Sequence, residues 1–541
     1  MRLSACFVVT PEAPQQARQP LRRPGSVAPL FRRSPILPIR HHRRPDSGVL
    51  ALATLLFVLP LVVYGSAVFH RYGLRDDYAI LREAREDPGK IPRVLASQGR
   101  PIYGWLLERS AHAANTIDGL SGLRLLGVVG LGLLGASLFL LLRREGWPLI
   151  TSALLAALLT LTPSAQVIAS WGICWPQAVA LVLGVAAFGL ARRGLPPPSE
   201  PATGGVGWRI AAAGVIAVAT LIYQASGLVY AVLLAAVLVL RHDDHFRDTM
   251  RWLMRHLTIM GAGLLMAFAV TKTLFLTGMV TPSPRIAFET HWVDKTLWAI
   301  THVLPNALAL IALNDTPTGM PAGSEFMVAA TLAVLAVGLA VEVRRGGLRG
   351  GGRWLLVLLT LSAAAYSVSF LAFERWPTYR TLYALTGVWG VFVAGSLMNL
   401  GSCWPRRGPW VMTSVLALFV GAGALLAHRQ SLELFALPQA RELALMEQGA
   451  RQVEPAKQSR VFVLTARQTD TSAPRRYLDE FGSVSVDAEW VAKEMLKALM
   501  KERFPLERDP SHLYRFAAGP NLPEPRNYDI LIDMRKMRQG G

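Results

Sequence analysis

Two adjacent carboxylates, Asp76 and Asp77, follow the first long apolar stretch of the chain by only a few residues. That stretch, 48–69, is long enough to cross a bilayer, because a helix rises about 1.5 Å per residue through a hydrocarbon core of roughly 30 Å. The two carboxylates should therefore lie at the membrane–water boundary. A carboxylate placed there can deprotonate a sugar hydroxyl as a general base.

The two aspartates belong to a charged loop, 70–120, whose apolar residues have the spacing of amphipathic helices lying on a membrane surface. Adjacent residues do not share a helix face, so one aspartate is expected to act directly and the other to orient it or bind a hydroxyl. Arg100, near the end of the loop, can bind phosphate through paired hydrogen bonds. The alternative is that an aspartate only caps a helix starting near Tyr78.

Three further cations could bind a lipid phosphate. Lys272 lies near the outer end of a predicted span, where it could face the bundle or extend to the headgroups. Arg375 and Arg380 lie in a very short outer loop, 374–380, against the usual charge bias of outer loops. Arg380 is the first choice for the phosphate and Arg375 the second; the alternatives are a surface ion pair with Glu374 or contact with anionic lipid.

A longer outer loop, 277–324, carries an amphipathic stretch over 292–313 and a small group of charged residues. Arg285 and Glu289 belong to this group and could line the path of an acceptor substrate. Charged residues of interfacial helices usually face solvent, which is the alternative.

Composition places the chain among multi-span membrane proteins. Of its 541 residues 52% are hydrophobic and 17% charged, and the mean hydropathy is +0.34. The net charge of +20 comes from arginines clustered between apolar runs, which is typical of cytoplasmic loops and not of a nucleic-acid-binding surface. The three cysteines lie far apart and support neither a disulfide framework nor a zinc site.

The apolar runs predict about eleven transmembrane helices, with the amino terminus inside and the carboxyl terminus outside, because the predicted inner loops carry the arginine pairs. The fifth and sixth runs could also form one kinked segment. The predicted spans are 48–69, 120–142, 147–163, 175–191, 210–224, 227–240, 257–276, 326–343, 354–373, 381–400 and 410–427, with a turn over 164–174 closing the third and fourth.

The two ends of the chain differ from the membrane part, 48–427. Residues 1–47 are rich in Arg and Pro and predict a disordered cytoplasmic tail; no cleavable signal peptide is expected, and a misassigned start codon is the alternative explanation. Residues 428–541 predict a small extracytoplasmic α/β domain, with strands at 460–465 and 528–533 and a helix at 488–504.

Several short motifs carry a family resemblance. They are Asp76-Asp77-Tyr78, Gly99-Arg100-Pro101, 171–177, Tyr223-Gln224, 380–383 and 479–482. With their positions in the topology, these motifs resemble the O-antigen glucosyltransferases of serotype-converting phages (Gtr type II). More broadly, they are similar to the GT-C class of polyprenyl-phosphate-sugar-dependent glycosyltransferases.

The resemblance implies a multi-pass enzyme of the bacterial inner (plasma) membrane that inverts the sugar by direct displacement. It would move a hexose, glucose above all, from a polyprenyl-phosphate carrier to an envelope glycan such as the O-antigen of lipopolysaccharide, or to a lipid-linked acceptor. Asp77 or Asp76 would be the base. The substrate-binding residues would be Tyr78, Arg100, Gln224, Lys272, Arg375 and Arg380.

No cofactor is required by this scheme, although a carboxylate pair could hold Mg²⁺ or Mn²⁺. Two other functions stay open. A flippase for lipid-linked sugars would need ionisable residues deep in several spans. A polysaccharide polymerase or ligase would be expected to carry a large, arginine-rich outer loop, whereas 277–324 contains one arginine.

Overall fold

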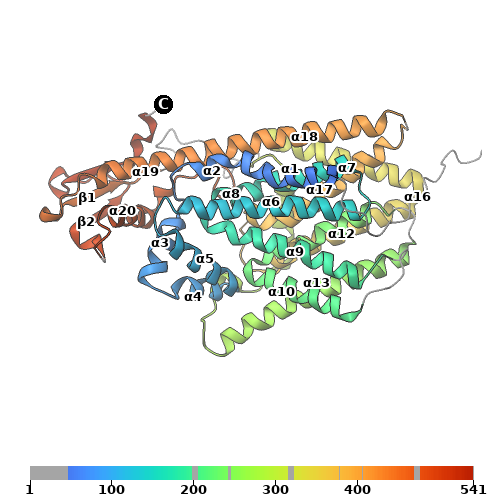
Figure 1. Ribbon diagram of the computed structural model, residues 1–541, viewed down its shortest axis with the longest axis horizontal. Coiled ribbons are helices and arrows are strands. Elements are labelled where there is room, and N and C mark those ends of the chain that lie inside the picture. Colours follow the sequence, from blue (N-terminus) through green and yellow to red (C-terminus); the bar gives the residue numbers. More distant parts are fainter. Residues whose placement is uncertain are drawn as a thin grey trace, which may run out of the picture. The chain divides into compact units, whose positions relative to one another are not determined.

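The computed structural model describes residues 47–197, 205–241, 245–314, 322–376, 378–404, 406–467, 475–507 and 509–539. Within these ranges the chain is mostly helical, with one small sheet near its C-terminal end (Figure 1). The tail predicted as disordered lies outside the described residues, except for Ser47 at the start of the first helix.

Six helices of the described residues are long and apolar enough to cross a membrane, and a bent pair of helices brings the number to seven. The chain is therefore a multi-pass membrane protein. The six are Leu120–Arg144, Gly172–Gly194, Phe246–Leu276, Gly323–Leu371, Tyr379–Gly401 and Gly408–Ala450, and three shorter apolar helices are Ser47–Val63, Val206–Ile222 and Gln224–Val239. The expected total of eleven stays a prediction.

The bent pair corrects the turn predicted over 164–174. Helix α7 (Leu149–Leu161) is followed at an angle of 57° by α8 (Pro163–Ser170), so most of this segment is helical. Thr162 between them is extended, because the ring of the following Pro163 disfavours helical geometry at the preceding residue, while proline itself suits the first turn of a helix. As a result, the residues that follow α8, 171–174, lie beside Asp77.

Two other breaks fall near predicted boundaries. The fifth and sixth runs are separate helices, α10 (Val206–Ile222) and α12 (Tyr230–Val239), with the short α11 (Gln224–Gly227) after an extended Tyr223. The eighth and ninth runs are two helices that share the label α16 (Ala322–Leu371) and are separated by a kink at Gly347. Its φ of +63° lies in the left-handed region that glycine tolerates.

The loop over 70–120, called the first outer loop after its predicted side of the membrane, folds into short helices, as its apolar spacing predicted. They are α3 (Asp76–Glu86), α4 (Lys90–Ser97) and α5 (Pro101–Ala114). Further helices are α1 (Ser47–Val63), α2 (Gly65–Phe69), α6 (Leu120–Arg144), η1 (Gly172–Cys174), α9 (Trp175–Gly194), α13 (Phe246–Leu276), α14 (Trp292–Trp298), α15 (Leu304–Leu308), α17 (Tyr379–Gly401), α18 (Gly408–Ser431), α19 (Leu437–Ala450) and α20 (Glu489–Arg503).

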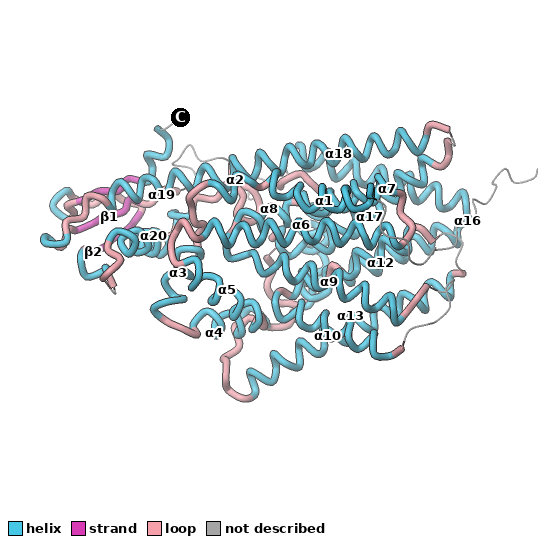
Figure 2. Tube along the Cα trace, viewed as in Figure 1, coloured by secondary structure: helices cyan, strands magenta, loops and turns pink. Residues whose placement is uncertain are grey.

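The C-terminal sheet is parallel, in the order β2-β1-β3, and consists of β1 (Arg460–Leu464), β2 (Arg515–Gly519) and β3 (Ile530–Asp533) (Figure 2). The two predicted strands and the helix α20 are confirmed. Helix α20 packs against α3 of the first outer loop, and Tyr78 and Leu81 share a hydrophobic core with Val461 and Met495. The first outer loop and the C-terminal sheet are thus held together by apolar packing.

Candidate active site at the start of helix α3

The turn that presents Asp76 is strained and anchored by the C-terminal part of the chain. Arg75, at the N-cap position of α3, has a φ of +44°, which costs a non-glycine residue about 1–3 kcal/mol. Its backbone N–H donates to Ser485 Oγ at 3.2 Å, and its guanidinium donates to Glu480 at 2.8 Å and to Asp487 at 3.3 Å. These contacts compensate the strain, so Ser485, Glu480 and Asp487 fix the residue next to Asp76.

Asp77 is fully buried, and its side chain binds backbone N–H groups. Its carboxylate accepts hydrogen bonds from Leu74 N–H at 2.9 Å and Ile173 N–H at 3.0 Å, joining the first outer loop to the segment after α8. The capping alternative is wrong in detail, because α3 begins at Asp76 and Asp77 binds an N–H that precedes the helix. Burial raises the pKa of Asp77 to about 6, against the two backbone N–H groups and Arg124, which favour the charged form.

This raised pKa predicts a pH dependence of stability. The folded state keeps the proton of Asp77 up to about pH 6, whereas the unfolded state loses it near pH 3.8, so rising pH destabilises the fold between these values. Over that range the wild type should lose about 3 kcal/mol more than Asp77→Asn, which has no such proton. Thermal midpoints of the two proteins in detergent, compared from pH 4 to 7, check this; parallel curves would contradict it.

Arg124, a residue that sequence reasoning overlooked, clamps the loop before Asp76. It lies fully buried in α6 and donates to the carbonyls of Ala67 at 2.5 Å, Tyr72 at 2.8 Å and His70 at 3.0 Å. Its guanidinium also lies over the ring of Tyr72, 3.9 Å from the ring centroid. A charged residue inside an apolar run was the available signal, since such residues are rare and functional.

Replacement of this clamp should loosen the loop. Arg124→Leu leaves three carbonyl groups without their donor, each at a cost of about 1–3 kcal/mol if it stays buried. We expect a lower thermal midpoint and faster tryptic cleavage at Arg71 or Arg75. Arg109→Leu, a change of the same type in the neighbouring helix α5, is the control and should leave the cleavage rate unchanged.

Asp76 is the aspartate available for chemistry. It is half-buried, and among the described residues its carboxylate has no hydrogen-bond or ion-pair partner. Burial raises its pKa; Arg380, Arg75 and Arg285 oppose that shift, whereas Glu480 adds to it. Among the described residues, Asp76 is thus a carboxylate without a bonded partner that lies within electrostatic range of three arginines and of Glu480.

Arg380, at the start of α17, forms an ion pair with Asp479, which is distant in the sequence. Its guanidinium contacts the Asp479 carboxylate at 3.0 Å and 3.2 Å, and it lies 4.6 Å from the ring centroid of Trp171. The Asp479 side chain has no exposed surface. Burial raises the pKa of Asp479, and Arg380 opposes that shift. Asp479 therefore serves as the resting counter-ion of Arg380.

The structure brings Arg100 and Gln224 together, as two of the predicted substrate-binding residues. Arg100 Nε donates to Gln224 Oε1 at 2.8 Å, and Gln224 Nε2 donates in turn to the carbonyls of Gln98 and Gly99. The guanidinium of Arg100 lies 4.6 Å from the ring centroid of Tyr223, whose hydroxyl is also within electrostatic range of Arg380. Gln224 thus positions Arg100 on the same side of the bundle as Arg380.

Two predicted binding residues lie elsewhere. Tyr78 is fully buried in the core shared with the C-terminal sheet, and its hydroxyl accepts a hydrogen bond from Gly73 N–H at 3.0 Å. Lys272 is exposed on α13, beside Thr271, whose side chain packs near Gly99. No contact of Lys272 with Asp76 or Arg380 is found in the described part of the chain.

Arg375 belongs to a second charged group near the site. It contacts the buried carboxylate of Glu289 at 3.3 Å, while Arg285 lies 3.6 Å from Glu374. Lys295 Nζ closes the group by donating to the carbonyl of Glu374 at 2.9 Å. The Glu374–Arg375 pair considered from the sequence is therefore replaced by pairs across two loops. Arg285, which the sequence suggested for the path of the acceptor, is the member of this group within electrostatic range of Asp76.

Within the described ranges, no three His, Cys, Asp or Glu side chains come together as a group that could hold a metal ion.

No family model matches the chain. No curated protein sequence matches it either.

Three solved structures align with much of the chain at low sequence identity. The oligosaccharyltransferase of Archaeoglobus fulgidus, in complex with zinc and sulfate, is 14% identical over 87% of this chain and 62% of its own, with a TM-score of 0.41. AglB of that organism, in complex with an inhibitory peptide and a dolichol-phosphate, is 12% identical over 86% and 64%, with a TM-score of 0.40. ArnT of Cupriavidus metallidurans is 13% identical over 78% and 83%, with a TM-score of 0.38. The chain spans less than two thirds of the archaeal enzymes' length.

Proposed function

We propose that this protein is a membrane glycosyltransferase of the GT-C type. It would transfer a hexose from a polyprenyl-phosphate carrier to an extracytoplasmic envelope glycan or lipid-linked acceptor. The observation that carries the proposal is the free, half-buried carboxylate of Asp76, with Arg75, Arg285 and Arg380 around it, in the loop after the first apolar helix. Asp76 is the better candidate base, because both oxygens of Asp77 are already used by backbone N–H groups.

In the proposed reaction Asp76 accepts the proton of the acceptor hydroxyl, and the hydroxyl oxygen forms a bond to the anomeric carbon. The bond from that carbon to the phosphate oxygen breaks, and the lipid phosphate leaves with the electron pair. A raised pKa suits a general base that must take a proton near neutral pH. Protonated Asp76 then returns its proton to water.

The leaving phosphate requires cations that are held in place before the reaction. Arg380 uses part of its guanidinium for Asp479 and keeps further N–H donors for a phosphate oxygen. Arg100 uses its Nε for Gln224, which leaves its two terminal nitrogens free to bind the same group. Arg285, which is 53% exposed, would complete the cation set from the outer loop. We assign no direct role to Tyr78, and Lys272 and Arg375 stay predictions from the sequence.

The location follows from the same scheme. In a bacterial inner membrane, the orientation predicted from the arginine pairs would make the first outer loop and the C-terminal part periplasmic and place residue 47 inside. A glucose donor and an O-antigen acceptor are the finer expectations of the sequence resemblance.

An assay in detergent tests the proposal against a flippase, because a transporter has no measurable product without a bilayer. The full chain is purified and incubated with polyprenyl-phosphate-hexose and with envelope glycan from a host strain that lacks the protein. A mass gain of one hexose on the glycan, with release of polyprenyl phosphate, is the expected result. Loss of glycan decoration in the deletion strain, combined with no product in detergent for any hexose donor, would favour the flippase.

A further inference from the structure

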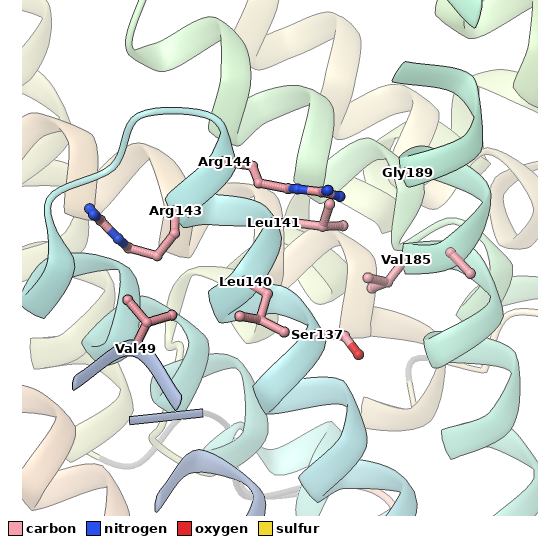
Figure 3. Close-up of a pocket in the computed structure, with 9 residues that line it drawn as sticks. Val49, Ser137, Leu140, Leu141, Arg143, Arg144, Val185 and Gly189 are labelled. Atoms are coloured by element: carbon pink, nitrogen blue, oxygen red, sulfur yellow. The ribbon is translucent and has the colours of Figure 1, made fainter. Parts of the chain in front are cut away.

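A pocket at the other end of α6 lies far from the candidate active site. Leu120 begins α6 next to the loop of Asp76, and Arg143 and Arg144 end it about 36 Å away, at 1.5 Å per residue. The pocket has a volume of about 650 Å³ and is bounded by α1, α6 and α9 (Figure 3). Its lining includes Val49, Leu140, Leu141, Arg143, Arg144 and Val185.

The walls and the rim of this pocket differ in chemistry. The walls are aliphatic, and Leu140 is 44% exposed, as expected for a surface that faces lipid tails. The rim is cationic: Figure 3 shows the Arg144 side chain extending from α6 above Leu141, toward the helix that carries Val185. An aliphatic groove with a cationic rim matches an amphiphile with an anionic headgroup.

The arginines near the rim differ in whether they have a partner. Arg192 donates two hydrogen bonds to Glu145, at 2.7 and 3.0 Å. Because both oxygens of Glu145, the acidic residue beside the pocket, bind Arg192, Glu145 does not pair with Arg144. Arg193 lies over the ring of Trp208. Arg144 is exposed, and no hydrogen bond or ion pair of its side chain occurs among the described residues.

The Arg143 side chain points away from Arg144, over Val49 (Figure 3). One of its terminal nitrogens donates to the carbonyl of Trp147 at 2.5 Å, while its Nε is buried with no hydrogen-bond partner. Arg144 is thus the arginine whose side chain extends above Leu141 and, among the described residues, has no bonded partner.

We infer that this pocket binds an anionic phospholipid, with its phosphate at Arg144 and an acyl chain along Leu140, Leu141 and Val185. The favoured ligand is a lipid of the leaflet at that end of the bundle. A basic pocket between transmembrane helices is a general means of recognising anionic headgroups, and each nearby arginine favours them by a factor of about five. The inference is independent of the proposed transferase activity.

Native mass spectrometry of the purified full chain tests this inference. Protein is incubated with phosphatidylglycerol or phosphatidylcholine of the same acyl chains. Arg144→Gln removes the free cation, and Gly189→Leu fills the apolar part, because a Cβ at Gly189 points toward Leu141 at 3.9 Å. Arg349→Gln is the matched control, since Arg349 is also exposed and lies on α16, outside the lining.

We expect the wild type and Arg349→Gln to retain phosphatidylglycerol in preference to phosphatidylcholine. Retention should fall roughly fivefold in Arg144→Gln and at least as much in Gly189→Leu, with thermal midpoints showing that both variants are folded. Equal retention of the two lipids, or unchanged retention in folded Arg144→Gln, would overturn the inference. Stronger retention of a polyprenyl phosphate than of phosphatidylglycerol would overturn the choice of ligand.

Discussion

Asp76→Asn is expected to lower hexose transfer by a factor of about 10² to 10⁴, the usual contribution of a general base. Asparagine has nearly the same shape as aspartate but cannot take the proton of the acceptor hydroxyl. Because the Asp76 carboxylate makes no hydrogen bond among the described residues, the substitution should leave the thermal midpoint almost unchanged. The measurement is the initial rate of product formation by purified protein in detergent.

Two further variants make this result interpretable. Asp118→Asn changes an aspartate of the same loop whose side chain is 72% exposed, and it should keep nearly full activity. Asp77→Asn should alter stability and its pH dependence, because Asp77 holds two backbone N–H groups. Wild-type rates in a folded Asp76→Asn protein would remove Asp76 from the mechanism.

Arg380→Gln is expected to impair both stability and transfer. The substitution leaves the fully buried carboxylate of Asp479 without its cation, which costs about 3–5 kcal/mol in comparable buried pairs. Asp479→Asn should destabilise less, because Arg380 keeps 16% of its side chain exposed to water. In the double variant no buried charge is left unpaired, so most of the thermal stability should return while transfer stays low.

The recovery separates the two roles of Arg380. If it were only a structural ion-pair partner, activity would return together with stability in the double variant, and that outcome would exclude a role in phosphate binding. Arg429→Gln serves as the control for losing an ion pair, because the Arg429–Glu433 pair is exposed and should contribute less than about 1 kcal/mol.

Much of the scaffold could be predicted from local patterns. Apolar runs and arginine pairs indicated the main helices, and apolar spacing in 70–120 predicted the surface helices α3 to α5. Strands β1 and β3 were predictable from branched residues such as Val461 and Ile530. Strand β2 was not, because Arg-Phe-Ala-Ala-Gly contains no branched residue and depends on its neighbour β1 for its extended form.

The site was only partly predictable. A carboxylate pair after an apolar run is a local signal, and it located Asp76. Which of the two aspartates is free depends on Ile173, which lies 96 positions from Asp77 in the sequence. The pairing of Arg380 with Asp479 likewise joins residues 99 positions apart. One sequence contains no periodicity or spacing that reports such contacts, so the partners of the site residues could not be derived.

The contact of the first outer loop with the C-terminal part restricts how many times the chain can cross the membrane between them. Arg82 of α3 pairs with Glu494 of α20 at 2.6 Å, so both segments occupy one compartment. The polypeptide must then traverse the bilayer an even number of times between them. The predicted spans satisfy this parity, since ten of the eleven fall in that interval. Reporter fusions after residues 115 and 455 should therefore report the same side, whatever the final count of crossings.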